Sequence, residues 1–263
     1  MKIITKISVQ EKRKDRYNIF LNEKYAFSVD EAVLIKHNLV KGQQLTEEDI
    51  EQIQVQEEDQ KAYGKAINFL SYRMRSTGEV FTYLKEQEVE EHVIQQILSK
   101  LMENGYLDDL AFANAYVRTM METTDKGPNV LKQELKLKSV SDAKIEEALL
   151  NFSEERMIEK VKKLAEKVAK KQRTQSAKML QLKVEEAIVK KGYPAYLLGE
   201  VKEEFEEQGM EEEEEWARLV TQGEKFARKY DKFEGYEKKM KLKQALFRKG
   251  FPLHLIDRYL EEE

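Results

Sequence analysis

Apolar residues recur along the chain at helical spacing, and one arrangement of them occurs four times. An apolar residue is followed five positions later by an apolar residue in a turn, and five positions after that by a third. The turn residue returns after 51, 53 and 58 positions. A nearly constant period of this size indicates an array of supersecondary units, each burying part of its apolar face against the next. The triplets are Leu84/Val89/Ile94, Leu135/Val140/Ile145, Ile188/Tyr193/Leu198 and Leu246/Phe251/Ile256.

The first 57 residues follow a different pattern from the rest. Apolar and polar residues alternate in three short runs, which predicts three antiparallel strands with a tight turn at Asn22-Glu23. A brief helix at about 30–38 and a second helix beginning after Thr46 complete a small α+β unit. So small a unit buries little apolar surface, and we expect it to pack on the helices that follow. The strand positions are Ile3, Thr5, Ile7 and Val9, then Tyr17, Ile19 and Leu21, then Tyr25, Phe27 and Val29.

From residue 58 onward the pattern predicts helices only. We divide this part into repeat 1 (58–107), repeat 2 (108–152), repeat 3 (153–209) and repeat 4 (210–263). The fold class is therefore mainly α: a tandem array of three-helix repeats, preceded by a small strand-containing unit at 1–57. The expected helices are 61–73, 77–87 and 90–104, then 110–122, 128–137 and 142–152, then 154–171, 175–191 and 194–208, then 212–229, 236–249 and 253–262.

Short motifs mark where these helices begin and end. Ser76 and Glu79 form a capping box, and Thr46 with Asp49 stands at the same spacing. Gly105 closes the third helix of repeat 1. Asp108-Asp109 follows it, and we interpret the pair as an N-cap with a second charge that favours the helix dipole. Ser141 is expected to cap the third helix of repeat 2.

Composition narrows the classes of function. The chain has 263 residues, no cysteine and three histidines, which excludes disulfides, iron–sulfur clusters and thiolate zinc sites. The histidines fall in different units, and no nucleophile–base arrangement or phosphate-binding glycine loop is present. We therefore expect no enzyme, no cofactor and no metal. No apolar run approaches the ~20 residues of a membrane span, and no signal-peptide core is present, so a soluble cytoplasmic protein is expected.

Charge is strongly segregated although the net charge is only −4. Residues 156–191 hold 12 Lys or Arg and 4 Glu, a local charge of +8. Residues 200–215 hold 10 Glu and 1 Lys, a local −9, and residues 225–249 hold 10 Lys or Arg and 3 acids, a local +7. Basic blocks suit phosphate or an acidic protein surface, whereas the acidic block would repel nucleic acid. Solvated helix faces explain any single block equally well.

Three groups of cations are candidates for binding DNA or an acidic protein surface. Along residues 160–171, lysines recur at helical period beside a parallel apolar row, so they form one stripe that could follow a phosphate backbone. A smaller group lies at a helix end in repeat 1, and a third lies in repeat 4. The candidates are Lys160, Lys163, Lys167, Lys170 and Lys171, then Arg73 and Arg75, then Lys241, Lys243, Arg248 and Lys249.

Two stretches resemble the signature of the RecX family, the bacterial regulators of the recombinase RecA. One runs from Leu70 to Leu84 and contains Arg73, Ser76 and Glu79 at Arg-x-x-Ser-x-x-Glu spacing. The other is Gly-Tyr-Leu-Asp-Asp-Leu-Ala-Phe-Ala at residues 105–113. The resemblance covers residues from about 60 to 262. The strand unit and repeat 4 are similar to the longer form of the family found in Gram-positive bacteria.

The resemblance implies an elongated crescent that binds the groove of the RecA–DNA filament. Altered filament growth or disassembly would lower strand exchange and ATPase activity, and so affect recombination, DNA repair and the SOS response. The family also implies a direct affinity for single- or double-stranded DNA in some members, and no catalytic residue. Because a solenoid of this kind is often a monomer, we expect a monomer. This chain has Gln87-Glu88 and Lys138-Ser139 where the family usually has Lys-Gly before the apolar turn residue. Those two turns are therefore in question, because Gly tolerates a positive φ at little cost.

Two alternatives stand beside filament binding. The chain could be a DNA-binding module acting alone, since three-helix units can place a helix in the major groove and the stripe supplies cations. It could also be a protein-interaction scaffold with no nucleic-acid partner, which needs only the repeats and the acidic block.

Overall fold

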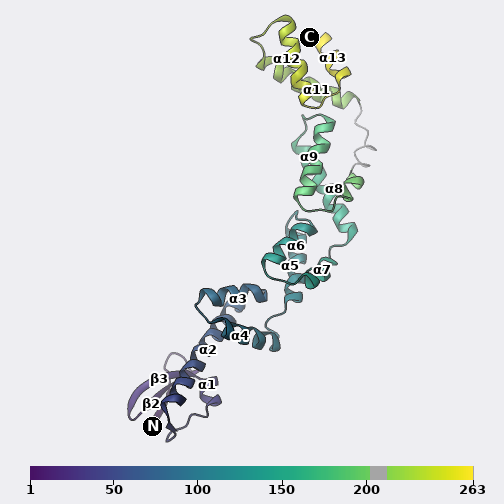
Figure 1. Cartoon of the computed structure of the whole chain (residues 1–263). Coiled ribbons are helices and arrows are strands. Elements are labelled where there is room, and N and C mark those ends of the chain that lie inside the picture. Colours follow the sequence, from purple (N-terminus) through teal and green to yellow (C-terminus); the bar gives the residue numbers. More distant parts are fainter. Residues whose placement is uncertain (202–211, 263) are drawn as a thin grey trace. The chain divides into compact units, whose positions relative to one another are not determined.

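The computed structural model describes residues 1–201 and 212–262, and its chain divides into two compact units. Unit 1 consists of Met1–Phe112 together with Lys138–Val140. Unit 2 consists of Ala113–Leu137 together with Ser141–Glu263. Figure 1 labels the helices and strands, and each unit is described by itself.

Unit 1 begins with a four-stranded antiparallel sheet. Strands β1 (Lys2–Val9), β2 (Arg16–Leu21) and β3 (Lys24–Asp30) confirm the three predicted runs. The alternation missed β4 (Gln44–Leu45), which is only two residues long and completes the order β3-β2-β1-β4. Asn22 and Glu23 both have positive φ, 49° and 67°, as a two-residue hairpin turn requires. Ile4, Ile19 and Val29 point inward, and α1 (Glu31–Lys36) covers them.

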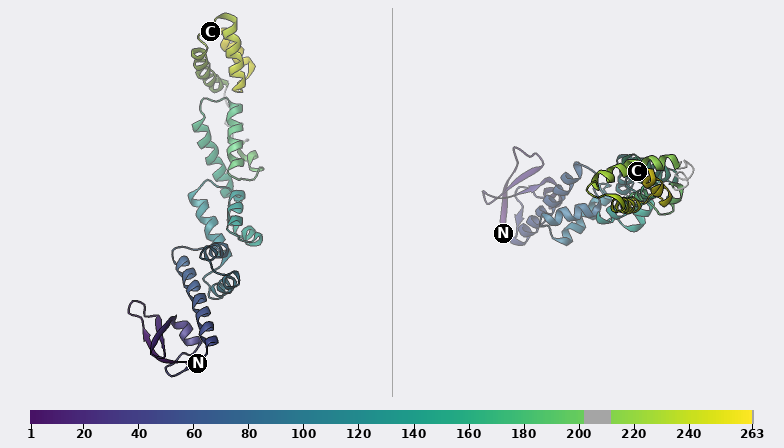
Figure 2. Two further views of the ribbon diagram at one scale, coloured as in Figure 1. Left: turned by 60° about the vertical axis from the view of Figure 1, so that its left-hand side comes forward. Right: turned by 90° about the horizontal axis from the view of Figure 1, so that it is seen from above.

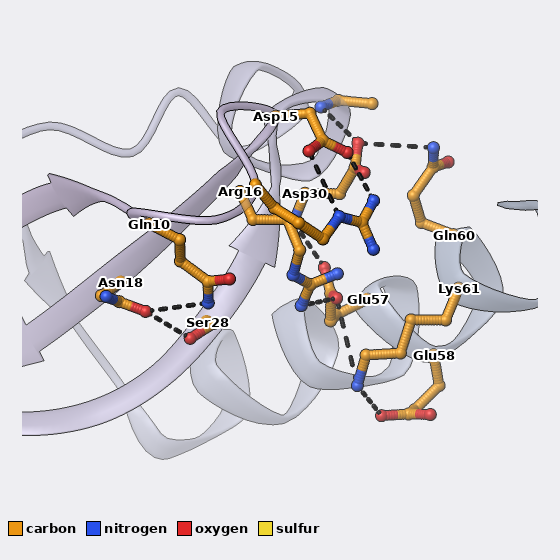
Figure 3. Close-up of polar contacts among 12 residues, drawn as sticks. Gln10, Asp15, Arg16, Asn18, Ser28, Asp30, Glu57, Glu58, Gln60 and Lys61 are labelled. Carbon is orange, nitrogen blue, oxygen red and sulfur yellow. Dashed lines mark hydrogen bonds and ion pairs between the residues drawn. The ribbon is translucent and has the colours of Figure 1, made fainter.

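A single 25-residue helix, α2 (Glu47–Ser71), replaces the two helices expected before residue 73. The Thr46–Asp49 capping box begins it, as predicted, and Figure 2 shows α2 leaving the strands without a break. Within α2, Glu57 is buried and accepts hydrogen bonds from the Arg16 guanidinium (2.6 Å) and the Asp30 amide (2.7 Å) (Figure 3). The predicted boundary at 57/58 therefore falls inside a helix.

Repeat 1 forms around the second half of α2. It continues with α3 (Thr77–Glu86) and α4 (Glu91–Glu103). Ala66 of α2, Val80 and Leu84 of α3, and Ile94 of α4 are fully buried in one cluster. Two members of the repeated triplet, Leu84 and Ile94, thus lie in the core as predicted.

Unit 2 carries the later helices at nearly the predicted positions. Leu131, Leu135 and Ile145 are fully buried in repeat 2, and Leu246 and Ile256 are fully buried in repeat 4. Most of the predicted helix 194–208 lies outside the described residues, as does most of the acidic block; a helix begins at residue 197. The helix bounds are α5 (Asp109–Thr123), which starts in unit 1, then α6 (Pro128–Leu137), α7 (Asp142–Leu149), α8 (Glu154–Lys171), α9 (Ala177–Lys190), α11 (Glu212–Lys229), α12 (Gly235–Arg248) and α13 (Leu253–Glu262).

The helix-to-helix turn keeps one backbone conformation in all four repeats. The residue before the apolar turn residue has φ +60° at Glu88 and at Ser139, and +82° at Gly192 and at Gly250. The two departures from Lys-Gly therefore preserve the left-handed turn at the cost of placing a side chain there. Ser141 occupies the N-cap position of α7, as predicted, but its hydroxyl makes no capping hydrogen bond.

Candidate protein and nucleic-acid interface

The first junction between consecutive repeats is made by the Ser76 capping box. The Ser76 hydroxyl accepts from the Glu79 amide (3.1 Å) and donates its own proton to the Lys138 carbonyl (2.7 Å) in the turn of repeat 2. The next amide, that of Thr77, donates to the Asp109 carboxylate (2.8 Å). Asp108 caps α5 as predicted, and Asp109 stands in the first turn of α5 while its carboxylate also serves the junction.

The same junction recurs between repeats 3 and 4. The Ser176 hydroxyl accepts from the Met179 amide (3.2 Å) and donates to the Lys249 carbonyl (2.6 Å). The Ala177 amide donates to both oxygens of Glu215, at 3.0 and 3.2 Å. Glu215 is buried, and burial raises the pKa of its carboxyl although the Ala177 amide opposes the shift. Two junctions thus share a serine that both caps and donates, and an acid that receives the next amide.

In the junction between repeats 2 and 3, backbone groups take the place of the serine and the acid. The Gly127 amide donates to the Lys191 carbonyl (2.7 Å), and the Asn129 amide donates to the Gly192 carbonyl (3.0 Å). Pro128 stands where Thr77 and Ala177 stand in the other junctions, and it has no amide to donate. The position equivalent to Asp109 and Glu215, judged from the buried residues that follow, is Met157. An acid is therefore present in the two junctions where the next amide needs an acceptor. Met157 replaces it in the junction where Pro128 has no amide to donate.

The predicted cations of repeat 1 hold the fold around the first junction. Arg73 and Lys138 each contact Glu79, both at 2.9 Å. Burial alone would raise the pKa of Glu79, but hydrogen bonds from Arg73, Lys138 and the Ser76 amide outweigh it and lower the pKa to about 2. Arg75 lies 4.0 Å above the Phe69 ring.

The predicted row on α8 is at the surface, but neighbouring acids match most of its charge. Lys160 is half-buried and donates to the Thr124 carbonyl (3.0 Å), whereas Lys171 is exposed. Exposed ion pairs are worth less than ~1 kcal/mol, so a phosphate could replace a carboxylate at little cost. The pairs join Lys163 to Glu159 (2.5 Å), Lys167 to Asp125 (2.9 Å) and Lys170 to Glu166 (3.8 Å).

The predicted cations of repeat 4 lie along α12 and its end. Lys241 pairs with Glu237 (3.5 Å), and Lys243 pairs with Asp257. Arg248 is exposed, and the Lys249 carbonyl is the acceptor in the junction with repeat 3. Lys241 and Lys243 are therefore in ion pairs, Arg248 lies on an open surface, and Lys249 takes part in a structural junction.

A group of aromatic rings and lysines at the α11–α12 corner escaped the sequence reasoning. Tyr230 lies 6.2 Å from Phe226 and 6.4 Å from Phe233, measured between ring centroids. The Lys232 and Lys241 ammonium groups lie 5.3 and 4.2 Å from the Phe233 ring. Helical spacing of the aromatics among lysines was the available signal, but it reads equally as core packing.

The fold and these surfaces define a helical-repeat protein with charged and aromatic exposed faces. Four models of RecX domains match the chain: the N-terminal domain at residues 2–46, the first three-helix domain at 62–101, the second at 108–149 and the third at 212–260. The chain belongs to the RecX family of regulatory proteins. The model of the third three-helix domain matches repeat 4 rather than repeat 3.

Curated relatives match over the whole chain. The regulatory protein RecX of Bacillus licheniformis is 46% identical over 263 residues, covering 100% of both chains. That of Bacillus subtilis is 44% identical, covering 100% of this chain and 99% of the relative. A crystal structure of regulatory protein RecX has a TM-score of 0.73 at 38% identity and covers 77% of this chain and 100% of its own. RecX from Lactobacillus salivarius has a TM-score of 0.54 at 34% identity and covers 56% of this chain and 96% of its own.

These relatives carry the name regulatory protein. Among residues 1–201 and 212–262, no helix combines the length and apolarity that crossing a membrane requires.

Proposed function

We propose that this chain binds the filament that RecA forms on DNA and modulates filament growth or disassembly, and through it recombination and DNA repair. Membership of the RecX family carries the proposal, because the domain matches extend from residue 2 to residue 260 and the relatives match over their full length. The chain would act by binding alone, as a cytoplasmic monomer without a cofactor. The divisions 1–57, 58–107, 108–152, 153–209 and 210–263 are proposed as its working units.

The charge pattern of α8 supports a mixed partner over bare DNA. Glu159, Glu166 and Asp125 sit among the lysines that would face phosphate. A surface of both signs attracts a continuous row of phosphates less strongly than an all-cationic surface does, and it suits a filament that presents protein and phosphate side by side.

The test is the single-stranded-DNA-dependent ATPase of the cognate RecA, titrated with this protein at two salt concentrations. We expect the ATPase rate to change at protein concentrations well below that of RecA, at both salts. An effect seen only at saturating protein and low salt would mean competition for DNA. A rate unchanged at every ratio would refute filament modulation.

The α11–α12 corner favours a second candidate function, direct binding of single-stranded DNA. Stacked aromatic rings beside lysines are the usual platform for unpaired bases, at ~1–3 kcal/mol per base. We expect Lys232→Glu with Lys241→Glu to weaken binding of a labelled oligothymidine steeply and to reduce its salt dependence. Lys183→Glu with Lys190→Glu on α9 is the matched control. Equal affinity of both variants would remove the corner as a DNA site.

A further inference from the structure

One pair of equivalent positions carries charged residues in repeats 1 and 2 and apolar residues in repeat 4. In repeat 2 the residue after the buried Leu135 is Lys136, and it pairs with Asp142 at the start of α7 (2.7 Å). Repeat 1 has Lys85 and Glu91 at the same two positions. In repeat 4 the same register, counted from Leu246, places Phe247 and Leu253 there.

Phe247 and Leu253 border a hollow instead of packing into the core. Their side chains are 57% and 50% exposed. The hollow has a volume of about 820 Å³ and lies between the start of α9 and the α12–α13 turn, with Met179 and Phe251 also on its wall. This volume is within the range of pockets that hold several side chains or a small ligand. Two large apolar side chains thus face open space where repeats 1 and 2 carry charge.

The rim of the hollow leaves positive charge available. Lys178 and Arg248 are both exposed, and neither has an ion-pair partner within the described part of the chain. Of the two acids on the rim, Glu215 is buried and accepts from the Ala177 amide, whereas Glu212 is exposed and lies 3.9 Å from the His254 ring nitrogen, so the two exposed cations outnumber the one exposed acid. A partner that fits must therefore bring apolar side chains together with negative charge.

We propose that the hollow docks a short segment of a partner protein in which one or two large apolar side chains are flanked by acidic residues. The apolar side chains cover Phe247 and Leu253, and the acidic flanks meet Lys178 and Arg248. The inference rests on the proposed function, because the partner it names is a subunit of the RecA filament. A buried aromatic anchor with a charged rim is the usual composition of an energetic hot spot.

The decisive variant is Phe247→Lys with Leu253→Asp, which installs the ion pair that repeat 2 already has. Because both side chains are half exposed and the net charge is unchanged, neither folding nor long-range electrostatics should alter. The matched control is Val189→Lys with Leu182→Asp, which replaces two exposed apolar residues of α9 outside the hollow. Affinities are measured for labelled RecA filaments on single-stranded DNA, and for the bare DNA alone.

We expect the Phe247/Leu253 variant to bind filaments at least tenfold more weakly and the control variant to bind within twofold of the native chain. Filament binding unchanged in the Phe247/Leu253 variant, with the native chain binding well, would overturn the inference and leave the proposed function standing. An equal loss on bare DNA would also overturn it, because the occupant would then be nucleic acid.

A peptide probe tests the hollow independently of RecA. The probe is a fluorescein-labelled peptide with central leucine and phenylalanine flanked by glutamates, and its counterpart has lysine flanks. We expect the native chain to bind the acidic probe at least tenfold more tightly than its counterpart, and the Phe247/Leu253 variant to lose the difference. If the native chain ignores filaments, the proposed function fails while the peptide result still decides the chemistry of the hollow. No preference for the acidic probe would overturn the inference.

Discussion

Gly78→Ala should destabilise the first junction although the same exchange usually stabilises a helix. Gly78 lies in the first turn of α3, where alanine would ordinarily be favoured by up to ~1 kcal/mol. A Cβ built there would lie 2.4 Å from the Ser139 Cβ, 2.7 Å from the Ser139 hydroxyl and 2.8 Å from the Lys138 carbonyl oxygen. The first distance is about 1 Å short of ordinary contact, so the junction must open.

The expected magnitude follows from what the opening breaks. The Ser76 hydroxyl loses the Lys138 carbonyl (2.7 Å), which leaves buried polar groups unpaired at ~1–3 kcal/mol. Residual crowding costs another ~1–3 kcal/mol. After subtracting the helix-propensity gain of ~1 kcal/mol, we expect a net loss of about 1–5 kcal/mol at the junction.

Hydrogen exchange measured by mass spectrometry is the suitable assay, because an array of repeats need not unfold in one step. We expect faster exchange in residues 76–86 and 138–145 and no change in strands β1–β3. The control is Gly64→Ala in α2, where nothing lies within 4 Å of the added Cβ and alanine should stabilise. Ser139→Gly added to Gly78→Ala should restore part of the protection, since Ser139 has φ +60° and glycine removes two of the three close contacts. Equal protection in Gly78→Ala and Gly64→Ala would refute the reasoning.

For three further perturbations, the structure fixes the direction in which stability changes. Glu57→Gln should destabilise the strand unit by ~3–5 kcal/mol, because it leaves the largely buried Arg16 guanidinium without its carboxylate. The loss should be seen as faster hydrogen exchange in β2 and β3. Exchange equal to that of the native chain would show that Arg16 finds another acceptor. The pKa of Glu79 is lowered to about 2, so its stabilisation is complete above the ordinary value of 4.5 and is lost as pH falls toward 2. The protection of the junction amides, taken relative to their intrinsic exchange rate at each pH, should fall across that window in the native chain and less in Glu79→Gln. Burial raises the pKa of Glu215, so the contribution of its carboxyl to stability declines as pH rises through 4.5 and beyond. Glu215→Gln keeps an oxygen for the Ala177 amide and should leave the thermal stability at pH 7 unchanged or higher. A clear loss of thermal stability would contradict this account.

Helices and turns were predictable because their signals are local. The predicted helix 154–171 matches α8 to the residue, and the Ser76–Glu79 box begins α3 as expected. Both depend on neighbours within one or two turns of the helix. Two helices were predicted where the structure has the single helix α2, in which the buried Glu57 pairs with Arg16, 41 residues away in the chain.

The cationic candidates show why a surface is harder to predict than a helix. The period of the α8 lysines correctly placed Lys163 and Lys167 on an exposed face. It could not show that Lys167 faces Asp125, 42 residues earlier, or that Lys160 turns toward the Thr124 carbonyl. Only the tertiary fold reveals how much charge remains for a partner, so whether these residues bind RecA or DNA stays a prediction.

The junctions explain a choice of residue that helix capping alone leaves open. Aspartate caps a helix about as well as serine, but a carboxylate only accepts, whereas a hydroxyl can accept from one amide and donate to a carbonyl. Ser76 and Ser176, both fully buried, use the two capacities at once, and each donates to the turn of the following repeat. The Asp108 carboxylate, at an exposed position, accepts from the Leu110 and Ala111 amides of its own helix α5. Serine at a buried N-cap therefore links the local signal for a helix start to the contact that joins one repeat to the next.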